Sequence, residues 1–238
     1  MKIEILFENS DIVAINKPAG VLVHPDGRSA KKKTIVDWIL KNYPNVSKVG
    51  DDLSRPGIVH RLDEDTSGVL LIAKNKQAFV HLKKLFEQGE VKKSYLAIVC
   101  ASVKNDRGII DRPIGRGDAS GSERRVGSGA TGTMREALTY YKVLERFDSS
   151  RDGGPYSLVE FYPKTGRTHQ IRVHAKSAGF PVACDKLYGK VGSCPMSLTR
   201  KALHAIRIEF KDTKGEIISI EAPPLPDFSG ALESLRKA

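Results

Sequence analysis

One short polar stretch, His60-Arg61-Leu62-Asp63-Glu64-Asp65-Thr66-Ser67-Gly68, carries the residues best suited to chemistry in this chain. It holds an imidazole, a guanidinium and three carboxyl groups within six residues, and an apolar run at residues 69–73 follows it directly. An unbroken apolar run of this length predicts a buried strand. A polar loop at the mouth of such a strand is anchored to a rigid element, and loops of this kind often carry function.

The residue types alone leave several interpretations of this loop open. It could be a solvated turn, or His60 and Asp63 could form a simple exposed pair. It could also be part of a metal-dependent nuclease, in which His60, Asp63 and Asp65 bind a divalent cation together with Asp51 and Asp52. Loss of activity with a chelator would favour that alternative.

The pattern His-Arg-Leu-Asp-x-x-Thr-Ser-Gly in this loop resembles, at every fixed position, the signature of the RluA-like family of RNA pseudouridine synthases. Further segments resemble family motifs and extend the resemblance over nearly the whole chain: residues 16–25, 93–97, 166–172 and 181–189. Cys184 stands where the family usually has Gly, and we expect only a mild backbone adjustment there.

The resemblance implies that specific uridines in ribosomal or transfer RNA are isomerised to pseudouridine. A nitrogen–carbon glycosidic bond is broken and remade as a carbon–carbon bond without redox change, so neither a cofactor nor a metal is expected. Asp63 is implied as the catalytic carboxylate, by attack on the anomeric carbon or by removal of the ribose 2′ proton. Tyr95 is implied to stack on the base and to assist proton transfer, and Arg172 to pair with Asp63.

The resemblance also implies a set of substrate-binding residues: Arg61, His60, Ile171, Thr66, Arg167 and His169. Because the target uridine must leave its stack, the planar guanidinium of Arg61 is expected to fill the vacated space. Ile171 is expected to form an apolar floor under the uracil. A non-catalytic RNA-binding module of the same fold is a second alternative, but binding alone requires none of Asp63, Tyr95 and Arg172.

The charge of the 238-residue chain points to a polyanionic partner. A formal net charge of +11 favours a nucleic acid, with an anionic membrane surface as the second possibility. The resemblance implies that this nucleic acid is structured RNA. No apolar run approaches the length needed to cross a bilayer, and we expect no membrane partner. The three cysteines, an odd count without close pairs, argue against a disulfide framework and a zinc site. We therefore expect a cytoplasmic monomer.

The order of apolar patterns predicts an α+β fold with a mainly antiparallel mixed sheet and flanking helices around a central active-site cleft. We expect eight or nine strands and three or four helices in one domain, residues 1–238, without an additional N-terminal RNA-binding domain. Thr34 and Thr168 are predicted helix N-caps. Residues 106–135, rich in Gly and Arg, predict a mobile basic arm that closes on RNA phosphates, or else a disordered insertion.

Overall fold

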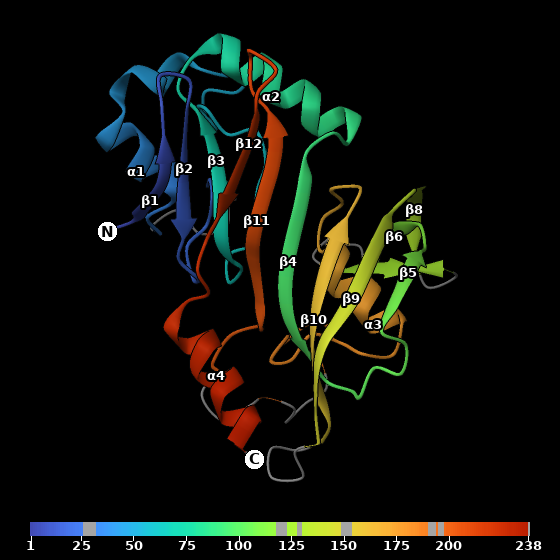
Figure 1. Ribbon diagram of the computed structural model, residues 1–238. Coiled ribbons are helices and arrows are strands. Elements are labelled where there is room, and N and C mark those ends of the chain that lie inside the picture. The colour runs from blue at the N-terminus through green and yellow to red at the C-terminus, as the bar shows by residue number, and fades with distance from the viewer. Residues whose placement is uncertain are drawn as a thin grey trace. The chain divides into compact units, whose positions relative to one another are not determined.

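The computed structural model describes residues 1–25, 32–117, 123–127, 130–148, 154–189, 194 and 198–237 (Figure 1). The chain forms two compact units. The first unit comprises Met1–Lys92 with Ala205–Pro224, and the second comprises Lys93–His204 with Leu225–Ala238. The predicted α+β class with a mostly antiparallel sheet is confirmed, whereas the predicted central cleft stays a prediction.

In the first unit, two strands that are buried along their whole length form the centre of the sheet. These are β2 (Ile12–Lys17) and β3 (Ser67–Ala73), which pair antiparallel. Two further pairings extend the sheet: β1 (Glu4–Glu8) forms a hairpin with β2, and β12 (Ile217–Glu221) pairs with β11 (Leu203–Lys211). The helices of this unit are α1 (Ile35–Asn42), α2 (Lys76–Gln88) and the 3-10 helix η1 (Pro44–Lys48).

The second unit is built on four antiparallel strands in the order β4-β10-β9-β5. These are β4 (Lys92–Val99), β10 (Tyr156–Pro163), β9 (Leu138–Phe147) and β5 (Arg107–Asp111), and α3 (Gln170–Ser177) and α4 (Pro226–Lys237) accompany them. A small separate sheet has the order β7-β6-β8 and consists of β6 (Ile114–Arg116), β7 (Arg124–Val126) and β8 (Thr131–Arg135).

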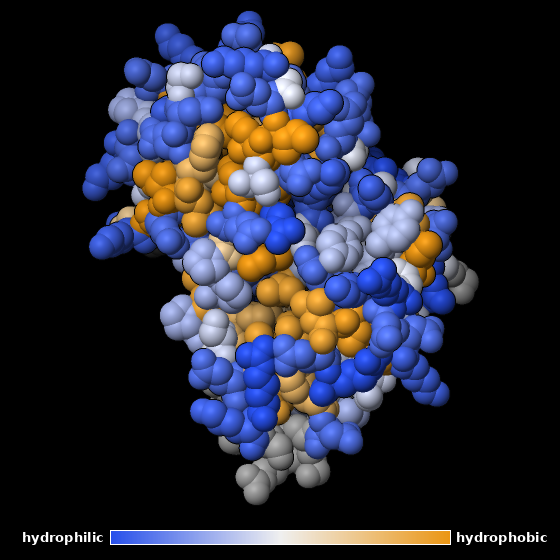
Figure 2. All heavy atoms as spheres, viewed as in Figure 1, coloured by the Kyte–Doolittle hydropathy of each residue, from blue (hydrophilic) through white to orange (hydrophobic). Residues whose placement is uncertain are grey.

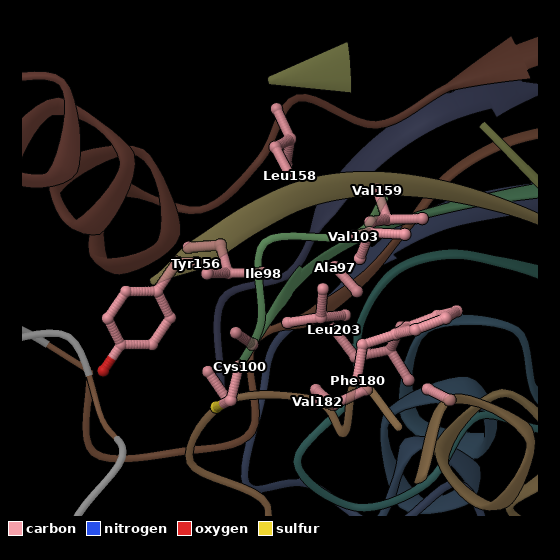
Figure 3. Packing of buried hydrophobic residues seen from close by; sticks show 14 of the residues in the cluster. Ala97, Ile98, Cys100, Val103, Tyr156, Leu158, Val159, Phe180, Val182 and Leu203 are labelled. Atoms are coloured by element: carbon pink, nitrogen blue, oxygen red, sulfur yellow. The ribbon is translucent and has the colours of Figure 1, made fainter. Parts of the chain in front are cut away.

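The core of the second unit lies between the β4-β10-β9-β5 strands and α3. Buried side chains from β4 and β10 gather with those of residues 180–183 (Figure 3). The rings of Tyr141, Phe161 and Phe180 have centroids 5.3 to 6.4 Å apart, and Ile171 and Ala175 of α3 belong to the same buried cluster. Burial of these side chains therefore fixes α3 against one face of the sheet.

Helix starts were predicted with mixed success. Thr34 caps α1 in a capping box with Asp37, as predicted. The prediction that Thr168 caps α3 was wrong, because His169 occupies the N-cap position with a left-handed backbone (φ 58°). No side chain caps this helix start, and the side chain of Gln170 accepts the backbone N–H of Arg167 in the preceding turn.

The segment 106–135 contains more regular structure than its composition suggested. Its described residues form β5 to β8, which raises the number of strands in the described chain to twelve. Ile114 is buried in a small cluster with Val173 of α3 and Tyr188, so part of the segment is packed within the second unit. The mobility of this basic arm stays a prediction, and its residues 118–122 and 128–129 lie outside the described residues.

Cys184 and Cys194 form a disulfide, with 4.8 Å between their Cα atoms. The expectation that the cysteines stay unpaired was therefore wrong, because pairing depends on distance in space and ten residues of chain can return to their starting point. Cys184 has a φ of 57°, in the left-handed region that glycine adopts easily. Cys184 thus keeps the backbone conformation that a glycine would take at this position.

Candidate active site

The loop that contains Asp63 is held at both ends. Leu62 is buried, and β3 begins at Ser67 with all seven of its residues buried. The backbone N–H of Thr66 donates to the carbonyl of Asp63 at 3.1 Å, which closes a tight turn. Asp63 itself is half-buried, so a carboxylate that remains accessible stands on a fixed backbone.

Lys17 anchors this loop through hydrogen bonds to backbone carbonyls. Its side chain is fully buried, and Nζ donates to the carbonyls of Pro18, Val21 and Glu64 at 2.8, 2.6 and 2.9 Å. The backbone N–H of Gly20 donates to the same Glu64 carbonyl at 3.0 Å. Residues 17–21 are therefore bound to the Asp63 loop through one buried ammonium group. The sequence indicated a rigid turn here but gave no sign of this role for Lys17.

Arg61 is exposed and lies against His24. Its Nη1 is 3.3 Å from His24 Nε2, and His24 Nδ1 is 2.9 Å from the carbonyl of Pro25. Burial lowers the pKa of His24 below its ordinary value, and the charge of Arg61 lowers it further, against the opposing effect of the Pro25 hydrogen bond. A neutral His24 with its proton on Nδ1 accepts a hydrogen bond from Arg61, and so positions it.

His60 and Thr66 both face the protein interior. His60 Nε2 accepts the backbone N–H of Leu71 at 2.9 Å, and its ring stacks on Phe86 with 4.7 Å between centroids. Thr66 is 2% exposed, and its hydroxyl has no hydrogen-bond partner among the described residues. These contacts stabilise the loop, and the predicted contacts of both residues with substrate stay predictions.

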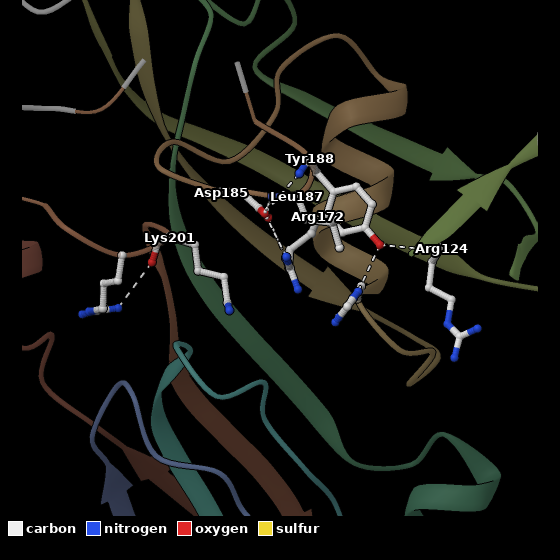
Figure 4. Close-up of polar contacts among 8 residues, drawn as sticks. Arg124, Arg172, Asp185, Leu187, Tyr188 and Lys201 are labelled. Carbon is white, nitrogen blue, oxygen red and sulfur yellow. Dashed lines mark hydrogen bonds and ion pairs between the residues drawn. The ribbon is translucent and has the colours of Figure 1, made fainter. Parts of the chain in front are cut away.

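In the second unit, Arg172 of α3 is bound to Asp185. Its Nε and Nη2 donate to the two carboxylate oxygens of Asp185 at 2.6 and 2.8 Å (Figure 4). Burial alone would raise the pKa of Asp185, but hydrogen bonds and charge from Arg172 outweigh it and hold the pKa below its usual range. Asp185 also accepts the backbone N–H groups of Leu187 and Tyr188, so it fixes the arginine and the following turn together.

Tyr188 connects this pair to two further segments. The guanidinium carbon of Arg172 lies 4.8 Å from the centroid of its ring. Its hydroxyl accepts the backbone N–H of Arg124 at 2.7 Å and lies 3.0 Å from His169 Nδ1 (Figure 4). Burial raises the pKa of Tyr188 to about 12, so the hydroxyl keeps its proton at neutral pH. Asp185 and Tyr188 are site residues that the sequence reasoning did not select, although both lie in a motif that it noted.

The other predicted residues of the second unit have different surroundings. Tyr95 is half-buried on β4, packs against the core cluster and is the register partner of Phe161. Ile171 is buried within that cluster. Arg167 is half-buried, and its Nε donates to the carbonyl of Glu136 at 3.0 Å. Their roles in substrate binding and catalysis stay predictions.

The predicted site residues are thus divided between the two units. Asp63, Arg61, His60 and Thr66 belong to the first unit. Tyr95, Arg167, His169, Ile171 and Arg172 belong to the second. Each group is ordered by its own hydrogen bonds, and the predicted pairing of Asp63 with Arg172 stays a prediction.

Comparison with known proteins identifies the family. The family model for RNA pseudouridylate synthase matches residues 11–177. The chain belongs to the RNA pseudouridine synthases. The resemblance to the RluA-like branch is confirmed, and this synthase is an isomerase that acts on RNA.

Relatives of this synthase match it along almost its whole length. A Bacillus subtilis protein named as an uncharacterized RNA pseudouridine synthase is 37% identical and is matched over 100% of this chain and 74% of its own. The ribosomal large subunit pseudouridine synthase D of Nitrosomonas europaea is 37% identical over 98% of this chain and 65% of its own. The structure of human RNA pseudouridylate synthase domain containing 1 has a TM-score of 0.77 at 27% identity, and covers 100% of this chain and 96% of the human one.

The comparisons give no support to the nuclease or to a non-catalytic module. Within the described part of the synthase, no group of three or more His, Cys, Asp and Glu side chains is arranged to hold a metal ion. His60 has its Nε2 occupied by the Leu71 amide, which removes one ligand that the nuclease would need. Among the described residues, no helix is long and apolar enough to span a membrane.

Proposed function

We propose that this synthase isomerises uridine in ribosomal RNA of the large subunit, with Asp63 as the carboxylate that acts on the ribose. Two observations support the substrate: several relatives carry the name ribosomal large subunit pseudouridine synthase D, and the net charge of +11 suits RNA. The observation that carries the choice of Asp63 is the loop itself, which combines a half-buried carboxylate with a backbone anchored by Lys17.

The reaction exchanges two bonds at one carbon. The bond from uracil N1 to the ribose C1′ breaks, the freed uracil turns, and a bond forms from uracil C5 to C1′. C5 loses a proton and N1 gains one, so the product is an isomer of the substrate. Asp63 acts at the ribose while the N1–C1′ bond breaks and the C5–C1′ bond forms, and Tyr95 assists the proton transfer at C5.

Arg172 is proposed to orient Asp63 and to favour its ionised form. Nε and Nη2 of Arg172 bind Asp185, which fixes the orientation of the guanidinium. Arg61 is proposed to occupy the space left by the flipped uridine, and its partner His24 orients it for that purpose. The proposed location is the cytoplasm, and the proposed state is a monomer.

Mapping of pseudouridine in cellular RNA tests this proposal. RNA from cells that lack the protein is compared with RNA from cells that carry the wild type, Asp63→Asn or Glu64→Gln. The isosteric Asp63→Asn variant should restore no pseudouridine while it still binds RNA. Glu64→Gln alters the adjacent carboxyl group and should restore the modification. Turnover by the Asp63→Asn variant within about tenfold of wild type would refute the role of Asp63. A site lost only from transfer RNA would refute the ribosomal substrate.

A further inference from the structure

Two tyrosines of the second unit project from the sheet face that lies away from α3. Successive side chains of a strand point to opposite faces, and Tyr141 and Phe161 point into the core beneath α3. Their neighbours Tyr140 and Tyr162 therefore point the other way. The register pairs Tyr162 with Tyr140, and Tyr140 with Ile109 of β5. These three side chains form one row across three strands, and Ile109 is 60% exposed.

Basic side chains border this row. Arg107 is the register partner of Lys142, so the two stand side by side in the neighbouring row on the same face. Lys164 Nζ lies 6.0 Å from the centroid of the Tyr140 ring. An open groove of about 530 Å³ runs along this surface, lined by Arg107, Gly108, Ile109, Tyr140, Tyr141, Lys142 and Tyr162. Figure 2 views this part of the molecule and shows pale and orange residues among blue ones over β5, β9 and β10.

The cations of this face are balanced only in part, since Glu160 on β10 is the register partner of Lys142. Neither Arg107 nor Lys142 forms an ion pair with any residue that the structure describes. Elsewhere many surface cations are paired, including Lys83 with Asp51, Arg207 with Glu221 and Arg236 with Glu145. Two carboxylates share the face: Glu160, which accepts the Ser94 hydroxyl, and the exposed Asp111 on β5.

We propose that this face, the Tyr140–Tyr162 platform (Ile109, Tyr140 and Tyr162 with Arg107, Lys142 and Lys164), binds an unpaired stretch of the RNA substrate. Bases stack on the two rings, and the three cations contact the flanking phosphates. Tyr140 and Tyr162 are each partly exposed. Partly exposed aromatic side chains on a sheet, bordered by Arg and Lys, suit single-stranded RNA because every base has a stacking face and every linkage a charge. A paired helix hides its bases and would use only the cations.

This inference deepens the proposed function and rests on it for the identity of the RNA. The platform residues lie outside the predicted catalytic set. Its contribution is to affinity: it holds a single-stranded segment next to the modified region, and the chemistry stays with the residues proposed above. Loss of the rings should therefore raise KM for a long RNA and leave kcat unchanged.

Binding of a labelled oligouridylate of about ten nucleotides, compared with an RNA duplex of equal length, tests the platform in the full chain. Tyr140→Leu/Tyr162→Leu should weaken binding of the single strand about 10-fold or more and change duplex binding less than about 2-fold. Tyr140→Phe/Tyr162→Phe keeps both rings and should bind like wild type. Unfolding midpoints of the variants verify that each one folds.

The charges are tested by salt dependence. Arg107→Gln/Lys142→Gln should reduce the slope of log affinity against log salt for the single strand by about 1.4, the value for two phosphate contacts. The control Arg207→Gln/Arg236→Gln removes the same charge elsewhere and should leave the slope unchanged. Equal effects of the two pairs, or equal losses on single strand and duplex with the leucine variant, would overturn the proposal.

Measurements of pseudouridine formation distinguish failure of the platform from failure of the proposed ribosomal substrate. Ribosomal RNA from cells that lack the protein serves as the substrate for wild type and the leucine variant. If wild type modifies that RNA and the leucine variant has the same KM, the platform is refuted while the function stands. If wild type forms no pseudouridine there, the proposed substrate is refuted, and the oligonucleotide measurements still decide whether the platform binds RNA.

Discussion

Arg172 donates two parallel hydrogen bonds to the carboxylate of Asp185, with Nε and Nη2 at 2.6 and 2.8 Å from its oxygens. Both side chains are almost fully buried, at 8% and 1% exposed. The same carboxylate accepts two backbone N–H groups of the turn that contains Tyr188. An arginine held in this way has lost its rotational freedom before any substrate binds, which suits a group that must orient a catalytic carboxylate.

We predict that Asp185→Asn lowers the turnover number more than it weakens RNA binding. Asn keeps the shape but replaces one accepting oxygen with a donor that faces the guanidinium. We expect kcat to fall roughly 10- to 100-fold with little change in KM, and the free energy of unfolding to fall by about 3–5 kcal/mol. Single-turnover kinetics and urea unfolding measure these effects. Asp227→Asn is the matched control, because Asp227 binds Arg200 through the same two-bond geometry. Similar losses of kcat in both variants would rule out a positioning role for Asp185.

We predict that His24 makes the free energy of unfolding depend on pH. Its folded-state pKa lies below 6.5, so the unfolded chain binds the proton more tightly. The stabilisation of the folded chain by neutral His24 is therefore complete above about pH 6.5, and it is lost as the pH falls through the folded-state pKa. Protonated His24 cannot accept from Arg61 and is repelled by Arg61 and Arg55, although Asp52 attracts it.

The matched variant for this term is His24→Gln, which keeps an acceptor for Arg61 and does not titrate. Between pH 7.5 and pH 5, wild type should lose more unfolding free energy than the variant, because His24 takes up its proton more readily in the unfolded chain than in the folded one. Denaturant unfolding at the two pH values measures the difference. Parallel pH dependence of the two proteins would show that His24 does not titrate in this range with a shifted pKa.

Lys17 predicts that the loop of Asp63 loosens when one buried ammonium group is removed. Lys17→Met keeps the length of the side chain but leaves three carbonyls without their donor, at an expected cost of about 3 kcal/mol. Amide exchange of residues 62–66 should become faster, and activity should fall with it. Lys74→Met is the control, since Lys74 bonds Glu8 and Asn9 at the surface and should cost below about 1 kcal/mol. Unchanged exchange in the Lys17 variant would refute its anchoring role.

We predict that only glycine is tolerated at position 68, near the start of β3. Its φ is +114°, and a Cβ atom there would lie 2.6 Å from the backbone nitrogen of Ala205. Gly68→Ala should cost roughly 3–5 kcal/mol, as the sum of backbone strain and overpacking. Gly20 has a φ of +77° with nothing within 4 Å of the added Cβ, so Gly20→Ala should cost only about 1–2 kcal/mol. Thermal unfolding compares the two, and equal shifts would mean that the contact with Ala205 contributes nothing.

The sequence by itself determined the elements and the chemistry of this protein. The apolar run of β3 depends on a local pattern of burial, and the strand was predicted correctly from its own residues. The Asp63 motif identified the family because its residues are contiguous in the chain. Contiguous patterns need no knowledge of the fold.

Tertiary structure alone decided the relationships between distant residues. Lys17 binds the carbonyl of Glu64 across 47 residues, Arg172 binds Asp185, and Cys184 pairs with Cys194. Residue types do not reveal which of many lysines or arginines is buried, because burial depends on how strands and turns pack around it. The row of Ile109, Tyr140 and Tyr162 likewise exists only through the register of three strands, since a shift of one residue would turn Tyr140 into the core.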